Sequence, residues 1–216
     1  MSRFLPSLLV VLLFASTAAS AAEGDALADR VATNAGVDDW SDVERVAFTW
    51  KHLPSGNERS FVWHPAQDSV AVTFNGTTTR IHTGSIGTDD QRRAHAAFVN
   101  DHYWMLFELR LALDTGVEFE DLGPRAVPGF DDMGDRRALR VHYTGDAGYT
   151  PGDAYVLYLG DDDLPDAWAF HRGGAEEPSL VTTRQDWGEA GGIRFPTRFV
   201  AADGTAFITI EDVTIE

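Results

Sequence analysis

The sequence predicts a mainly β protein with a few helices, in which about eleven antiparallel strands form one sheet that curves around the helices. Most of the chain consists of short runs with an apolar residue at every second position, separated by turn signals. Helical patterns occur in two places only, before the first strand and between the fourth and the fifth. The connections are too short for crossovers between most strands, which leaves antiparallel pairing.

Residues 1–22 have the features of a secretory signal peptide. Arg3 precedes an apolar run from Leu8 to Phe14, and Ala19, Ser20 and Ala21 form an A-x-A cleavage site. The apolar run is too short for a membrane-spanning helix, which needs about 20 residues. Because the chain has no cysteine, the lipid anchor of bacterial lipoproteins is excluded. We therefore expect a periplasmic or secreted protein that starts at residue 22 or 23.

Residues 23–216 suit a single domain, and we expect a monomer. Without cysteine there is no disulfide, so stability comes from the core alone. The chain carries 34 Asp and Glu against 17 Lys and Arg, a net charge of −17. Such a surface repels nucleic acid, which is therefore excluded as a partner. Adaptation to salt and a GC-rich genome both explain why Lys51 is the only lysine, and the sequence does not decide between them.

The first elements are a helix and four strands. In residues 25–36, Leu27, Val31 and Ala35 recur at helical spacing, and Gly36 stands where a C-cap belongs. The strands are expected over residues 44–53, 59–65, 68–74 and 77–84. Asn75-Gly76 predicts a tight hairpin between the last two, because both residues tolerate positive φ.

A helical region follows. Thr88-Asp89-Asp90-Gln91 forms a capping box, which predicts a helix from about residue 89. Asn100-Asp101 is expected to break this helix, so a second one runs over residues 102–113. An extended segment is the alternative, because Phe107, Leu109, Leu111 and Leu113 also alternate. After Gly116 the alternation returns, and Asp203-Gly204 signals another hairpin. The remaining strands are expected over residues 117–122, 138–145, 153–160, 166–174, 179–187, 192–201 and 205–216.

Several segments resemble the LolA/LolB-like superfamily of exported bacterial proteins, which includes the outer-membrane lipoprotein-sorting proteins. The segment "GGIRFPTRFVAADGTAFITIEDVTIE" is similar to the last strands of that family, and "AFTWKHL", "FVWHP" and "VAVTFNG" look like its opening hairpins. The run "YWMLF" resembles a helix of an uncharacterised secreted branch. The resemblance covers nearly the whole mature chain and implies a half-barrel with helices on its concave face. It also implies that the concave face is apolar and holds acyl chains.

A hydrophobic site is predicted between the early strands and the second helical region. Side chains two apart in a strand point the same way, so the aromatic residues of the first three strands share one face. "YWMLF" is too short to span a bilayer and too apolar for a solvated helix, so it is buried against something. An ordinary packed core and a ligand cavity with a helical lid both explain this. The cavity residues would be Phe48, Trp50, Phe61, Trp63, Phe74, Tyr103, Trp104, Leu106 and Phe107.

Motifs for catalysis and metal binding are weak. The chain has no G-x-S-x-G elbow, no phosphate-binding glycine loop and no H-E-x-x-H pair. Several strands carry a histidine, namely His52, His64, His82, His142 and His171. We therefore expect a non-catalytic protein without a cofactor that binds a lipid, a lipoprotein acyl chain or another hydrophobic ligand, with a membrane-associated exported partner. The alternatives are a metal-dependent hydrolase built on strand-borne His and Asp, and an interaction module with a filled core.

Overall fold

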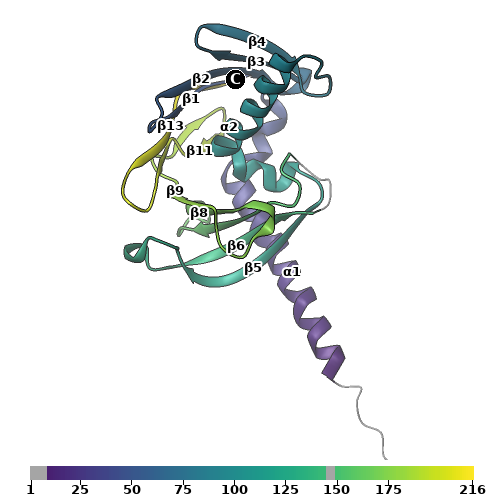
Figure 1. The fold of residues 1–216 in the computed structure, drawn as a ribbon. Helices are drawn as coiled ribbons and strands as arrows, with labels where there is room; N and C mark the ends of the chain where they lie inside the picture. Colours follow the sequence, from purple (N-terminus) through teal and green to yellow (C-terminus); the bar gives the residue numbers. More distant parts are fainter. Residues whose placement is uncertain (1–8, 145–148) are drawn as a thin grey trace, which may run out of the picture.

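The computed structural model describes residues 9–144 and 149–216 and confirms a mainly β fold (Figure 1). Within these ranges the chain forms two long helices and thirteen strands, in antiparallel sheets that do not close into a barrel. The expected half-barrel agrees with this architecture. The helices and strands are α1 (Leu9–Asn34), β1 (Val46–His52), β2 (Asn57–His64), β3 (Ser69–Phe74), β4 (Thr77–His82), α2 (Asp89–Leu113), β5 (Val117–Ala126), β6 (Asp135–Tyr143), β7 (Ala154–Leu159), β8 (Pro165–His171), β9 (Leu180–Thr183), β10 (Gly188–Ala190), β11 (Ile193–Phe195), β12 (Arg198–Val200) and β13 (Ala206–Ile215). Short 3-10 turns are η1 (Val37–Asp42), η2 (Pro65–Gln67), η3 (Asp131–Met133) and η4 (Arg172–Gly174).

Two large sheets face each other across α2. One has six strands in the order β12-β13-β1-β2-β3-β4, and the other has five in the order β5-β6-β7-β8-β9. Isolated bridges from Thr182 to Ala201 and from Gln185 to Arg198 connect the end of β9 with β12, so the sheets meet along one side. In Figure 1 the six-stranded sheet lies above α2 and the five-stranded sheet below it. The helix is therefore enclosed by a curved β surface.

The strand count differs from the predicted eleven near the C-terminus. Residues 192–201 were expected to form one strand, but the chain turns at Pro196-Thr197 and forms β11 and β12 instead. Proline lacks a backbone N–H and cannot continue a ladder, which explains the interruption. β11 then pairs with β10, a short strand that the sequence analysis did not predict, in a separate hairpin.

Helix α1 carries the predicted apolar stripe. Leu27, Val31 and Ala35 are fully buried, and Gly36 ends the helix with a φ of 92°. Gly24 lies so close to β5 that an added Cβ would stand 2.6 Å from the Phe119 carbonyl oxygen. The helix starts at Leu9, within the predicted signal peptide, and residues 1–8 lie outside the described part of the chain. Among the described helices, none is both long and apolar enough to cross a membrane.

Helix α2 begins at the predicted capping box but does not break where expected. Thr88 Oγ1 accepts a hydrogen bond from Gln91 N at 3.2 Å, and Gln91 Oε1 accepts one from Thr88 N at 3.1 Å. The expected break at Asn100-Asp101 was wrong, because the helix continues and kinks at Leu106 (φ −121°, ψ 25°). Arg59 of β2 donates a hydrogen bond to the carboxylate of Asp101, so this carboxylate does not compete with the helix for backbone N–H groups.

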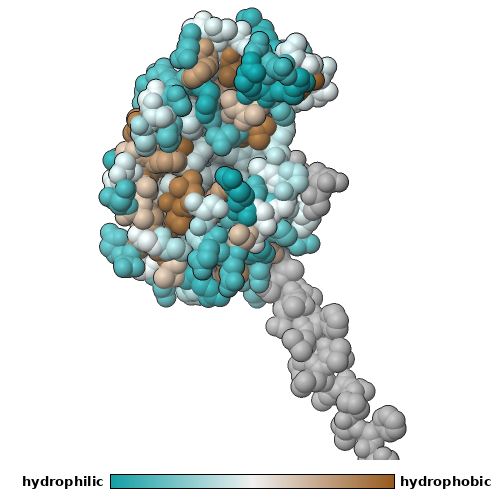
Figure 2. All heavy atoms as spheres, in the orientation of Figure 1, coloured by the Kyte–Doolittle hydropathy of each residue, from teal (hydrophilic) through white to brown (hydrophobic). Residues whose placement is uncertain are grey.

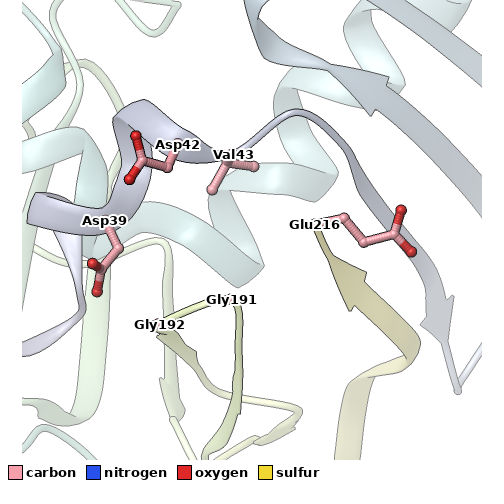
Figure 3. Close-up of a pocket in the computed structure, with 6 residues that line it drawn as sticks. All are labelled: Asp39, Asp42, Val43, Gly191, Gly192 and Glu216. Carbon is pink, nitrogen blue, oxygen red and sulfur yellow. The ribbon is translucent and has the colours of Figure 1, made fainter.

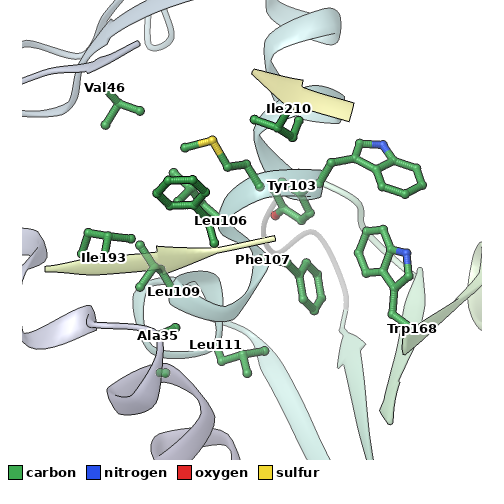
Figure 4. Packing of buried hydrophobic residues seen from close by; sticks show 14 of the residues in the cluster. Ala35, Val46, Tyr103, Leu106, Phe107, Leu109, Leu111, Trp168, Ile193 and Ile210 are labelled. Atoms are coloured by element: carbon green, nitrogen blue, oxygen red, sulfur yellow. The ribbon is translucent and has the colours of Figure 1, made fainter. Parts of the chain in front are cut away.

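The core surrounds the second half of α2. All nine residues from Asp101 to Leu109 are buried, which accounts for the apolar run in the sequence. Figure 4 shows Leu109 beside Ile193 on one side of the helix and Phe107 beside Trp168 on the other. A helix that is buried on all sides needs apolar residues around its whole circumference.

Candidate functional site

A cleft of about 1050 Å³ lies beside α2, between the two large sheets. This volume lies just above the usual range for small-molecule sites, roughly 300–1,000 Å³. Figure 2 shows hydrophobic side chains, in brown, gathered between the two sheets on one face of the molecule. Eight Trp, Tyr and Phe side chains line the cleft: Trp50, Tyr103, Trp104, Tyr149, Tyr155, Trp168, Phe170 and Phe207.

The inner aromatic residues of the cleft pack against one another. Trp104 of α2 meets Trp168 of β8 edge to face, with ring centroids 5.0 Å apart, and Tyr155 of β7 stacks on Trp168 at 5.3 Å. Such pairs add about 0.5–1.5 kcal/mol beyond the area that they bury. These rings are mostly buried, whereas Phe170 and Phe207 are half-buried and present more apolar surface to the cleft. The inner wall is therefore a packed aromatic surface, and Phe170 and Phe207 form its more accessible part.

The structure places three of the nine predicted cavity residues in the cleft, namely Trp50, Tyr103 and Trp104. Trp63, also predicted to line the cavity, is half-buried and packs against Trp40 and Phe98 instead. The residues that are buried in the core without lining the cleft are Phe48, Phe61, Leu106 and Phe107.

Phe74 lies at the end of β3 with 42% of its surface exposed. It pairs in register with Arg59, which pairs with Trp50, so it belongs to the predicted face of the sheet. The alternation therefore identified the correct face. The alternation does not show how far along the strands helix α2 reaches. The exposure of Phe74 shows that α2 does not cover the end of β3.

Sequence reasoning missed the wall that comes from the later strands. Tyr155, Trp168, Phe170 and Phe207 belong to β7, β8 and β13, far along the chain from α2. The run "AWAF" in β8 did show the alternation of Trp168 and Phe170. Nothing in the sequence shows that the five-stranded sheet, which contains β7 and β8, packs over α2, because that contact depends on how the two sheets meet.

Arg59 is the main charged side chain between the cleft and α2. Its Nε and Nη2 donate to the two carboxylate oxygens of Asp101 at 2.6 and 2.9 Å. Its guanidinium also lies over the indole of Trp50, 4.1 Å from the ring centroid. Burial raises the pKa of Asp101, and the hydrogen bonds from Arg59 oppose this rise. The pair fixes α2 to the six-stranded sheet beside the cleft.

A buried ion pair lies behind the aromatic wall. Arg184 Nη2 lies 2.7 Å from Glu108 Oε1 and donates to Oε2 at 2.8 Å, and both side chains are almost completely buried. The guanidinium of Arg184 lies 4.9 Å from the ring centroid of Trp168. Burial raises the pKa of Glu108 and lowers that of Arg184, while their mutual attraction opposes both shifts. This pair joins α2 to the segment after β9.

Two tyrosines share one carboxylate at the end of α2. Tyr103 and Tyr143 donate to Asp114 Oδ2 at 3.0 and 2.9 Å, and Arg110 pairs with the other oxygen. Burial raises the pKa of Tyr103 to about 12, so this hydroxyl stays protonated at neutral pH. The cluster therefore has the character of a structural anchor rather than of a general base.

The strand histidines do not converge. His52 Nδ1 contacts Ser55 Oγ at 2.7 Å, His64 Nδ1 contacts the Glu44 carbonyl, and His171 Nδ1 contacts the Ala175 carbonyl. Within residues 9–144 and 149–216, no group of three or more His, Asp or Glu is arranged to hold a metal ion.

A smaller pocket of about 310 Å³ lies near the C-terminus (Figure 3). Asp39, Asp42 and Glu216 contribute carboxylates to it, and Gly191 and Gly192 form its opposite side. In a chain with a net charge of −17, such a cluster is expected on charge alone. The acidic pocket is therefore not a candidate site.

The fold and the cleft together define an open antiparallel half-barrel with an aromatic cleft beside its central helix. No protein-family model matches this sequence, and a comparison with curated proteins finds no match.

Proposed function

We propose that the protein is a non-catalytic, exported protein that binds a lipid, a lipoprotein acyl chain or another hydrophobic ligand in the cleft beside α2. The observation that supports this most is the size of the cleft, about 1050 Å³, combined with its eight aromatic lining residues. A module with a filled core would need no such space between its sheets. The resemblance to LolA/LolB-like proteins and the predicted signal peptide are in keeping with this proposal.

The energetics favour an alkyl chain as the occupant. Each methylene that moves from water into an apolar site contributes about 0.8 kcal/mol. Half-buried Phe170, Leu180 and Phe207 provide apolar surface for such a chain. A bound chain is therefore expected to persist through mild purification.

Titration with a fluorescent fatty-acid probe tests the proposal. Trp50, Trp104 and Trp168 line the cleft, so energy transfer from tryptophan should report a probe bound there. We expect saturable binding of one probe per protein and its displacement by an unlabelled fatty acid. A folded protein that shows no saturable transfer would indicate a filled core, and the proposal would be abandoned.

A further inference from the structure

The cleft is much less acidic than the chain as a whole. The whole sequence has 34 acidic residues against 17 Lys and Arg, a ratio of two to one. The lining contains Arg59, Arg172 and a single carboxylate, Asp153, a ratio of one to two. Asp153 Oδ1 already accepts a hydrogen bond from Gly173 N at 2.7 Å. Asp101 offsets the charge of Arg59 from behind the lining, so the cleft is close to neutral and repels an anion far less than the rest of this acidic chain.

Arg59 is held in place with donors left over. A guanidinium has five N–H donors, and Asp101 accepts from Nε and Nη2, which leaves Nη1 without a partner among the described residues. The side chain of Arg59 is 20% exposed. Because Asp101 and the indole of Trp50 fix the guanidinium from two sides, binding an anion costs little side-chain entropy.

Trp50 adds an independent observation. Its Nε1 is a donor only, it is buried, and it has no hydrogen-bond partner in the described part of the chain. Trp50 lines the cleft and pairs in register with Arg59. A buried donor without an acceptor is costly, so an oxygen atom of a ligand at this end of the cleft would remove a penalty.

We propose that the occupant of the cleft is a single-chain amphiphile with an anionic headgroup, of which a fatty acid is the simplest example. The carboxylate accepts hydrogen bonds from Arg59 Nη1 and Trp50 Nε1, and the alkyl chain lies along the aromatic wall. Arg172 of η4 adds a second positive charge to the lining. This inference rests on the proposed function and specifies the class of ligand.

The test compares ligands of equal chain length and different headgroup. Displacement of a neutral fluorescent lipid probe from the full chain gives the affinities of decanoate and of decan-1-ol at pH 7. We expect decanoate to bind about tenfold more tightly, because hydrogen bonds to a charged group are stronger than neutral ones. Acetate, which has the headgroup without the chain, should displace no probe.

Three variants locate the headgroup. Arg59→Gln combined with Asp101→Asn removes both members of the ion pair, leaves no buried charge unpaired, and should abolish the preference for decanoate. Asp101→Asn alone frees the charge of Arg59 and should strengthen the binding of decanoate. Arg125→Gln, at an exposed position of β5 outside the cleft, removes one positive charge away from the ligand and should have no effect.

The outcomes separate the inference from the proposed function. Equal affinities for decanoate and decan-1-ol, or a preference that persists in the double variant, would overturn the anionic headgroup and leave hydrophobic binding intact. Failure of the wild type to bind the neutral probe or either ligand would refute both.

Discussion

Trp104 is a single side chain through which the proposed ligand binding can be tested. It lines the cleft and is 7% exposed, in contact with Trp168 and Phe199. We expect Trp104→Glu to reduce the affinity for a fatty-acid probe, because a carboxylate in the wall repels the ligand and attracts water. Phe74→Glu is the matched control, since Phe74 is 42% exposed and lies outside the lining, and it should leave binding unchanged.

A carboxylate at position 104 also strains the fold, so a milder change is needed beside it. Phe170→Ser affects a half-buried residue of the cleft and should reduce binding with a smaller loss of thermal stability. Variants that melt earlier but bind the probe as the wild type does would contradict the assignment of this wall.

The buried ion pair of Glu108 and Arg184 should affect the free energy of unfolding. Arg184→Met leaves the Glu108 carboxylate buried without its partner, which should lower the free energy of unfolding by about 3–5 kcal/mol. The double variant Glu108→Leu, Arg184→Met buries no charge and should lose much less. Urea unfolding measures both, and a double variant no more stable than the single one would contradict this reading of the pair.

Helix α2 depends on its first turn as well as on its buried half. Thr88 and Gln91 form both hydrogen bonds of the capping box. Thr88→Ala leaves a backbone donor unsatisfied and should cost about 1 kcal/mol, within a range of roughly 0.5–2. The melting temperature should fall while probe affinity stays constant, because Thr88 lies outside the cleft lining. An unchanged melting temperature would mean that the helix does not need this cap.

The elements that the sequence predicted well are those with local causes. The hairpin at Asn75-Gly76 forms with φ values of 50° and 75°, and the capping box starts α2 at Asp89. The failures have causes that are distant in the chain. Asn100-Asp101 predicts a break in the helix, but Arg59 of β2, distant in the chain, binds the Asp101 carboxylate and the helix continues.

Prediction of the candidate site was limited in the same way. The apolar run of α2 and the aromatic face of the early strands are visible in the sequence, and Trp50, Tyr103 and Trp104 do line the cleft. The opposite wall comes from β7 and β8 of the five-stranded sheet, and its approach to α2 is a property of the complete fold. The apolar run of α2 predicts a helix that is buried on all sides. It does not show where the two sheets leave a cleft beside that helix.

The stability of the whole molecule should depend on pH through His102. Burial, and next the charge of Arg110, lowers the pKa of this side chain from 6.5 to about 3. The unfolded chain therefore binds a proton between these values and the folded chain does not, so stability is present at neutral pH and falls as pH drops below about 6.5. Between pH 7 and pH 4.5 this group alone should cost about 2–3 kcal/mol.

The variant His102→Gln isolates this contribution, because glutamine does not titrate and every other group is retained. Its free energy of unfolding, measured in urea at both pH values, should fall less than that of the wild type. Equal losses in the two proteins would show that His102 is protonated in the folded state.

The space between the two sheets is formed by the molecule as a whole, and we expect it to hold a hydrophobic ligand. Native mass spectrometry detects such a ligand as added mass, on the protein purified without detergent and then incubated with a bacterial lipid extract. We expect a folded monomer that carries one additional mass, released on activation as a single-chain anionic lipid. A folded protein that shows only its own mass, both as purified and after incubation with lipid, would rule out a ligand site between the sheets.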